Sequence, residues 1–344
     1  MLNEESSTAV QKDPLAPLVF APVFRNVVKA YGFLKTRVRH TPTEYSEALS
    51  EIAGAPVYVK WENQQLSGSF KIRGALYAMN SLDDARRSKG IVTCSSGNHG
   101  QGVALAAKSM GVKAIVFVPE TCPELKKKKI RQLGGDWVEL RVAAGDYDFA
   151  EAEAHEFAAR EGRTYLSSYE DAAIVSGQGS AGMEMFMDEP DIEYLLIPAG
   201  GGGLLNGISI AAKAIAPGVE IFGVQSEASN PWVVSWPGGV VKTVTYSDTL
   251  ADGLAGGIPQ SLLTLAKKRV SGMLEVTEND IKRAIAFVHR EHRQIIEGAG
   301  AVGVAALLSG AAKPNGRRTG IFVSGGNIDD AKLREILAIA TNLA

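Results

Sequence analysis

The sequence SGSFKIRGA occupies residues 67–75, and the rest of the chain is organised around it. A single lysine, Lys71, follows an aromatic residue, Phe70, and is flanked by glycines and small hydroxyl residues. Residues 57–62 alternate as a β-strand does, so the segment predicts a loop between a strand and a helix. A lysine that forms a Schiff base needs such surroundings, because its amine must be desolvated and the backbone must leave room for a cofactor. From this segment alone, a solvated lysine in an ordinary loop is the alternative.

The composition is that of an ordinary globular protein. Of 344 residues, 45% are hydrophobic and 22% are charged, enough for a large core or for two domains. The net charge of −2 predicts no nucleic-acid partner and no attraction to anionic lipid. No apolar run could span a bilayer, and the N-terminus lacks the order of a secretory signal, so no membrane partner is expected. Two cysteines, Cys94 and Cys122, fit a reducing compartment, and we expect a cytoplasmic enzyme.

Strand and helix patterns alternate along the chain. Strands are predicted at 91–93, 112–118, 137–142, 194–198, 219–225 and 320–323. Helices are predicted at 23–36, 75–82, 101–110, 123–133, 147–161, 204–215, 278–291 and 299–309. Residues 1–20 are interpreted as a loosely held arm, and 167–178 and 231–254 as irregular segments. The alternation predicts an α/β fold of two open, twisted, mostly parallel sheets with helices on both faces and a cleft between them.

Three turns rich in small residues follow predicted strands, where ligands of such sheets bind. Gly200, Gly201, Gly202 and Gly203 open a helix, so their N–H groups could cradle a phosphate, although the spacing is not that of a dinucleotide fingerprint. Residues 95–101 offer hydroxyls, an amide and free N–H groups at a helix start, a receptor for a carboxylate. Residues 324–327 offer a hydroxyl at a strand end. A ligand-free tight turn and a simple helix cap are the alternatives for the first two turns.

Other signals are interpreted as structural. Lys126–Lys129 is predicted to be the solvated face of a helix, since no aromatic platform accompanies it. His289 and His292 lack the arrangement of a zinc-binding helix. Cys94 lies five residues before His99, which is weak evidence for a thiol nucleophile.

Together, residues 67–75, 95–101, 200–204, 297–301 and 324–327 resemble the threonine/serine dehydratase family. These are fold-type II enzymes, similar to the β subunit of tryptophan synthase, that use pyridoxal 5′-phosphate (PLP). The resemblance covers residues 20 to 340 in order. It implies a large PLP-binding domain at 1–66 and 173–344, a small substrate-side domain at 67–172, and an active site in the cleft between them. The family also implies a homodimer or homotetramer. We expect no feedback inhibition by isoleucine, because the resemblance extends to the catalytic core and not to a regulatory domain.

The resemblance also implies the roles of individual residues. Lys71 would form the Schiff base and act as the base at Cα, with Phe70 against the ring. The predicted cofactor contacts are Asn98 to the 3′-oxygen, Gly200, Gly201, Gly202, Gly203 and Leu204 to the phosphate, and Ser324 to the pyridine nitrogen. The carboxylate of a small amino-acid substrate would be bound by Ser95, Asn98 and His99. Glu297 would contact these site residues rather than the substrate or the cofactor. The implied reaction is loss of water from a β-hydroxy-α-amino acid, followed by hydrolysis to a 2-oxo acid and ammonia.

Departures from the family pattern leave the substrate open. Ser96 occupies a position where serine racemases carry a second catalytic serine, so racemisation with side dehydration is an alternative. Residues 167–171 read SSYED where the family often reads HPFDD, and larger substrates such as phenylserine or 3-hydroxyaspartate are therefore possible. Residues 249–256 and 297–301 are similar to the hydroxyectoine-utilisation branch.

Glu227 matches the glutamate of a divalent-cation site in some relatives, but its acidic partner is replaced by Val233, so we expect no metal. Two further alternatives are a β-replacement lyase of the same fold and a cofactor-bound sensor without catalysis.

Overall fold

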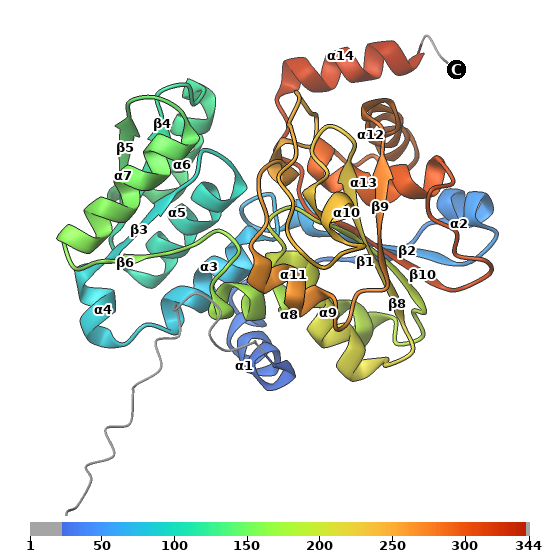
Figure 1. Ribbon diagram of the computed structural model, residues 1–344, viewed down its shortest axis with the longest axis horizontal. Helices are drawn as coiled ribbons and strands as arrows, with labels where there is room; N and C mark the ends of the chain where they lie inside the picture. Colours follow the sequence, from blue (N-terminus) through green and yellow to red (C-terminus); the bar gives the residue numbers. More distant parts are fainter. Residues whose placement is uncertain (1–22, 342–344) are drawn as a thin grey trace, which may run out of the picture.

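The structure is a computed structural model that describes residues 23–341, so the predicted N-terminal arm lies outside the described residues. Two sheets organise the chain (Figure 1). One has six strands in the order β1-β2-β10-β7-β8-β9, and the other has four in the order β5-β4-β3-β6. Every pairing is parallel except that of β1 with β2. The predicted α/β fold with two open, mostly parallel sheets is therefore confirmed.

The four-stranded sheet forms the core of a small lobe. Its strands are β3 (Ile91–Cys94), β4 (Ala114–Pro119), β5 (Val138–Ala143) and β6 (Thr164–Tyr165), and its helices are α3 (Lys71–Asn80), α4 (Asp84–Lys89), α5 (Asn98–Met110), α6 (Glu124–Gly134) and α7 (Tyr147–Arg160). Strand β4 is buried along its whole length. Its alternate side chains enter two cores, one shared with α3 and α5 and one shared with α7, because successive residues of a strand point to opposite faces.

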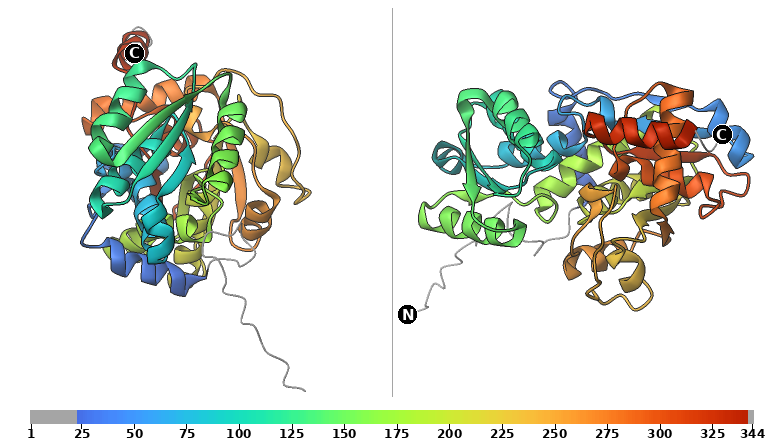
Figure 2. Two further views of the ribbon diagram at one scale, coloured as in Figure 1. Left: turned by 90° about the vertical axis from the view of Figure 1, so that its left-hand side faces the viewer. Right: turned by 90° about the horizontal axis from the view of Figure 1, so that it is seen from above.

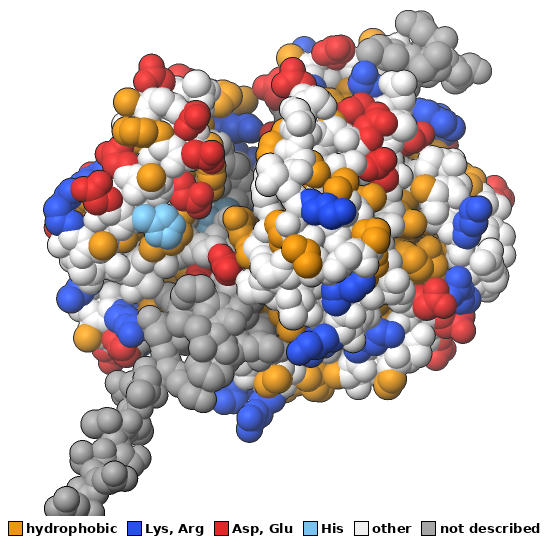
Figure 3. Space-filling model, in the orientation of Figure 1, with side chains coloured by type: hydrophobic (Ala, Val, Ile, Leu, Met, Phe, Trp, Pro, Cys, Tyr) orange, Lys and Arg blue, Asp and Glu red, His pale blue; other side chains and the backbone are white. Residues whose placement is uncertain are grey.

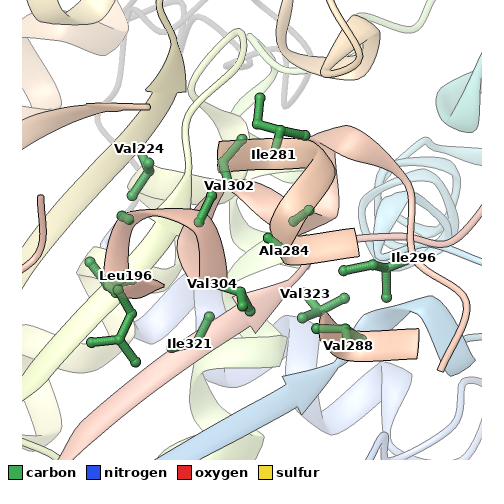
Figure 4. Close-up of a cluster of buried hydrophobic side chains, with 14 of the residues drawn as sticks. Leu196, Val224, Ile281, Ala284, Val288, Ile296, Val302, Val304, Ile321 and Val323 are labelled. Atoms are coloured by element: carbon green, nitrogen blue, oxygen red, sulfur yellow. The ribbon is translucent and has the colours of Figure 1, made fainter. Parts of the chain in front are cut away.

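The six-stranded sheet forms the core of a large lobe. Its strands are β1 (Thr43–Tyr45), β2 (Val57–Trp61), β7 (Tyr194–Pro198), β8 (Glu220–Ser226), β9 (Gly272–Val276) and β10 (Thr319–Val323). One face packs on α12 (Glu278–His292) and α13 (Gly298–Leu308), where Leu196, Val302 and Ile321 meet (Figure 4). The other face packs on α8 (Ala172–Asp188), α9 (Gly203–Ile215) and α11 (Gln260–Ala266).

The remaining elements are short or peripheral. They are α1 (Phe24–Leu34), α2 (Glu47–Ala53), α10 (Pro231–Ser235), α14 (Asp330–Thr341) and the 3-10 turns η1 (Glu62–Gln64), η2 (Gly135–Trp137) and η3 (Asp252–Leu254). In the described residues no helix combines the length and the apolar character needed to cross a bilayer. The two lobes lie side by side in Figure 1 and in the right-hand view of Figure 2. The four-stranded sheet falls wholly within residues 67–172, whereas the domain boundaries themselves stay a prediction.

The prediction of an irregular segment at 167–178 is wrong from Ala172 onward, where α8 begins, whereas 167–171 do form an irregular connection. The glycines of this helix are sites of close approach to neighbouring helices. A Cβ at Gly177 would lie 2.7 Å from the carbonyl oxygen of Arg73, and one at Gly179 would lie 2.7 Å from that of Gly207. Glycine therefore allows α8 to pack closely against α3 and α9, and this packing outweighs its low helix propensity.

Two helices also begin earlier than predicted: α3 begins at Lys71 and α5 at Asn98. The sequence analysis did not predict β1, β6, β9, α2, α4, α10, α11 or α14, most of which are too short to show a clear period.

A buried ion cluster joins the two lobes. Arg73 of α3 donates to both carboxylate oxygens of Glu62, at 2.8 and 2.7 Å, and to both of Glu184 in α8, each at 2.7 Å. Lys60 of β2 lies 3.0 Å from Glu184, and all four side chains are buried. Burial alone would raise the pKa of Glu62, but Arg73 and Lys60 hold it below its ordinary value. Each buried carboxylate has a cationic partner, and each cation has a carboxylate. Because none of these charges can lose its partner without a large cost, the cluster fixes the start of α3 against β2 and α8.

We expect Arg73→Met to lower the free energy of unfolding by about 3–5 kcal/mol, because two buried carboxylates lose the guanidinium that they share and only Lys60 remains to compensate them. Urea denaturation of the cofactor-free protein measures this loss. Arg25→Met, at an exposed position of α1, is the matched control and should change stability by less than about 0.5 kcal/mol. A loss of under 1 kcal/mol in Arg73→Met would contradict the structural role of the cluster.

Candidate active site in the cleft between the lobes

The loop that carries Lys71 is held by the loop that follows β10. Ser69 forms an isolated β-bridge with Gly325, and the Phe70 N–H donates to the Ser324 carbonyl at 3.1 Å. Lys71 is the first residue of α3, and its Nζ donates to the carbonyl of Ser168 at 2.9 Å. The Lys71 ammonium also lies 5.3 Å from the centroid of the Phe70 ring. The side chain therefore reaches the segment that links β6 to α8. A groove between the two lobes is visible in Figure 3.

Burial lowers the pKa of Lys71 to about 8, and the negative charge of Glu297 opposes the shift only in part. At pH 7 about a tenth of the Lys71 amine is therefore uncharged, far more than of an ordinary lysine. An uncharged amine is the form that attacks an aldehyde carbon or accepts a proton.

The glycine turn lies between β7 and α9, as predicted. Gly202 has φ +102°, a conformation that favours glycine. A Cβ on Gly201 would lie 2.4 Å from the ring of Tyr169, so only glycine fits beneath that ring. Leu204 is buried in the core, so its backbone N–H is its available contribution. The first N–H groups of the 13-residue helix α9 point out of the turn and favour an anion.

The Asn98 and Glu297 side chains meet directly. Asn98 Nδ2 donates to Glu297 Oε1 at 2.6 Å, and Asn98 Oδ1 accepts from Asn327 Nδ2 at 2.6 Å. Burial, together with the negative charge of Asp252, raises the pKa of Glu297 to about 7. The two predicted residues thus come together from α5 and from the N-terminus of α13.

Ser324 directly follows β10, and its side chain is buried. Its hydroxyl donates to the Ala299 carbonyl at 3.3 Å, a long hydrogen bond that leaves the oxygen lone pairs free. A hydroxyl at this position can meet a ring nitrogen without bringing a formal charge.

His99 is buried, and within the described residues neither of its ring nitrogens has a hydrogen-bond partner. Burial and the positive charge of Lys71 lower the pKa of His99 to about 3, although the backbone of Leu166 partly opposes this. His99 is therefore neutral at physiological pH and close to Lys71.

The other two hydroxyls of this loop face different neighbours. The Ser95 hydroxyl accepts from the Gly97 N–H at 3.2 Å. The Ser96 hydroxyl interacts with the Cys122 thiol. The predicted roles of Ser95 and Ser96 stay predictions.

The prediction that Lys126–Lys129 is a solvated face is wrong in part. Lys127 is buried, and Lys126 and Lys129 are half-buried and reach the large lobe. The Lys126 ammonium lies 3.3 Å from Asp252 Oδ2, and that of Lys129 lies 2.5 Å from Asn327 Oδ1. Their spacing of three residues places both on one side of α6, which is the signal that could have identified them.

The weak metal candidates have structural partners. Glu227 Oε1 accepts from the Glu278 N–H at 3.3 Å, and His292 Nε2 lies 3.0 Å from Ser46 Oγ. Among residues 23–341 no group of three or more His, Cys, Asp or Glu side chains could hold a metal ion. The absence of a metal stays a prediction.

The chemistry of these groups matches that of PLP. An aldehyde requires a neutral amine, which Lys71 supplies, and a phosphate suits the N–H groups at the start of α9. Buried polar atoms without partners among the described residues, Ser69 Oγ and both ring nitrogens of His99, lie on the segments around Lys71. Such atoms usually have a partner in the functional state, so the site fits a polar ligand.

Comparison with protein-family models matches residues 34–325 to the family described as pyridoxal-phosphate dependent enzyme. The chain belongs to this family. Its predicted cofactor, PLP, is thereby confirmed. Two similar members are L-threonine ammonia-lyase of Thermotoga maritima, 39% identical over 88% of this chain and 75% of that protein, and L-threo-3-hydroxyaspartate ammonia-lyase of Saccharomyces cerevisiae, 32% identical over 90% and 95%. Among solved structures, maize serine racemase has a TM-score of 0.87 and 28% identity, covering 94% of this chain and 98% of that one.

We expect the Lys71 amine of this PLP family member to react with aldehydes at unusually low pH. In the cofactor-free protein, reductive methylation of Lys71 by formaldehyde should rise with pH around a midpoint near 8, because the neutral amine predominates above its pKa. Mass spectrometry of the Lys71 peptide measures the rate, and the exposed lysines of the same sample are the internal reference. A midpoint for Lys71 near the ordinary lysine value of about 10.4 would contradict the effect of burial.

Proposed function

We propose that this PLP enzyme is an ammonia-lyase that converts a β-hydroxy-α-amino acid to a 2-oxo acid and ammonia by eliminating water. The observation that carries the proposal is the environment of Lys71, whose pKa is about 8. Its Nζ donates to Ser168, the next residue Tyr169 packs on Gly201 of the glycine turn, and the charge of Lys71 acts on His99. Relatives named as L-threonine and L-threo-3-hydroxyaspartate ammonia-lyases support it, since both names describe this reaction class.

Different residues of the chain would bind the cofactor and transfer the proton. The Lys71 amine would hold the cofactor and afterwards take the proton from Cα, a role that suits a pKa near neutrality. Bound PLP supplies an electron sink for the charge left at Cα. The N–H groups of Gly200–Gly203 and Leu204 would bind the phosphate, Ser324 the ring nitrogen and Asn98 the ring oxygen.

Ser95, Asn98 and His99 would bind the substrate carboxylate. Because His99 is neutral, it would do so through a hydrogen bond rather than through charge. A hydroxyl at Ser324, in place of a carboxylate, would leave the ring nitrogen unprotonated. That arrangement favours elimination, in which the charge leaves with the hydroxyl group.

The substrate side chain would face the segment 167–171, where Tyr169 lies over Gly201. Threonine, serine, 3-hydroxyaspartate, phenylserine and a hydroxyectoine-derived acid all remain candidates. Because Ser96 is the predicted second base, racemisation stays an alternative activity.

The predicted homodimer or homotetramer and the cytoplasmic location also stay predictions. The buried free cysteines Cys94 and Cys122 are compatible with a reducing compartment.

The purified protein is expected to show a visible absorption band that is lost in Lys71→Ala and kept in Lys128→Ala, an exposed position on α6. It should release 2-oxo acid from at least one member of a panel of β-hydroxy amino acids, assayed together with chiral analysis of the remaining substrate. A band with D-amino acid or an exchanged side chain, but no 2-oxo acid, would replace the proposal by a racemase or a β-replacement enzyme. A band without any turnover would indicate a sensor.

A further inference from the structure

One lysine of α6 takes part in the site although the proposed chemistry does not use it. Lys129 Nζ donates to Asn327 Oδ1 at 2.5 Å, and Asn327 follows β10 in the other lobe. Its neighbour Lys128 is exposed and makes no hydrogen bond or ion pair within the described residues. The contact therefore belongs to Lys129 in particular and not to the lysine run as a whole.

The contact of Lys129 begins a directed chain of hydrogen bonds. Lys129 donates to Asn327, Asn327 donates to Asn98, and Asn98 donates to Glu297, at 2.5, 2.6 and 2.6 Å. An ammonium only donates and a carboxylate only accepts, so the two ends fix the orientation of both amides between them. Asn98 then presents its Nδ2 toward Glu297 and keeps one N–H for a further acceptor.

Asn327 has no spare donor. Its second amide hydrogen is donated to the Ser67 carbonyl at 3.0 Å. Its Oδ1 lies against Gly68, where an added Cβ would be only 2.4 Å away. Gly68 has φ +74°, which suits glycine. Asn327 is thus packed on the loop that carries Lys71, and Lys129 is the partner that completes it from the small lobe.

We propose that Lys129 is a positioning residue, which orients Asn98 toward the ring oxygen of PLP through Asn327 and closes the small lobe onto the lysine loop. The proposal rests on the proposed PLP contacts but not on which amino acid is the substrate. Lys129 does not touch the reacting atoms in this role.

The charge of Lys129 also acts on Glu297. The charged groups that face Glu297 are Asp252 from η3, Lys126 and Lys129 from α6, and Lys71 from α3. Removing one of the three positive charges raises the pKa of Glu297 further above its ordinary value. A protonated Glu297 is a poorer acceptor for Asn98, so the low-pH limit of PLP binding should move to higher pH.

Equilibrium dialysis of PLP against the cofactor-free protein tests this between pH 5.5 and 8.5. We expect Lys129→Met to weaken PLP binding at pH 7 by about tenfold, the effect of one charge-assisted hydrogen bond, and to shift the acidic midpoint upward. Lys129→Arg should restore most of the affinity and the midpoint, and Lys128→Met is the matched control without effect. Lys129→Gln keeps a donor without the charge, and it tests the midpoint if the Met variant does not fold.

Unchanged PLP affinity and midpoint in Lys129→Met would overturn the proposal. So would a lower melting temperature with an unchanged midpoint, since that result describes a purely structural residue. PLP binding is measured without substrate, so a wild-type protein that binds PLP but releases no 2-oxo acid refutes the proposed reaction and leaves this test intact.

Discussion

The structure depends on the paired carboxylates around Arg73. Arg73 lies two positions after Lys71 in α3. Side chains two residues apart in a helix are rotated by about 200°, so the guanidinium and the amine face nearly opposite sides of α3. The guanidinium is bound by Glu62, which follows β2, and by Glu184 of α8. A buried ion pair adds little net stability over an apolar contact, but it tolerates no rotation, because each charge must keep its partner. The direction of Lys71 follows from this constraint.

Burial then sets the protonation of the site. The same loss of solvent lowers the pKa of Lys71 and His99 and raises that of Glu297, because it disfavours every charged form. At neutral pH the site therefore combines a partly neutral amine, a neutral imidazole and a carboxyl near its midpoint. An enzyme that transfers protons near pH 7 requires groups poised in this way.

The main errors of the sequence analysis share one cause. The sequence predicts an irregular segment at 167–178 and a solvated face for the lysines of α6, because local composition is the only information available. In the structure Gly177 and Gly179 of α8 meet the backbones of α3 and α9, and Lys129 meets Asn327, which lies 198 positions further along the chain. Contacts at such a separation leave no mark on local composition.

By itself the sequence determined the alternation of strands and helices, the family, and the segments that carry the chemistry, because period and turn chemistry are local properties of the chain. The 67–75, 95–101, 200–203 and 324–327 motifs could all be located in this way. Only the tertiary structure decided which side chains meet: Arg73 with two acids, Asn98 with Glu297, and Lys129 with Asn327. It also decided the pKa of Lys71, since desolvation depends on what the fold packs around an amine and not on its neighbours in sequence.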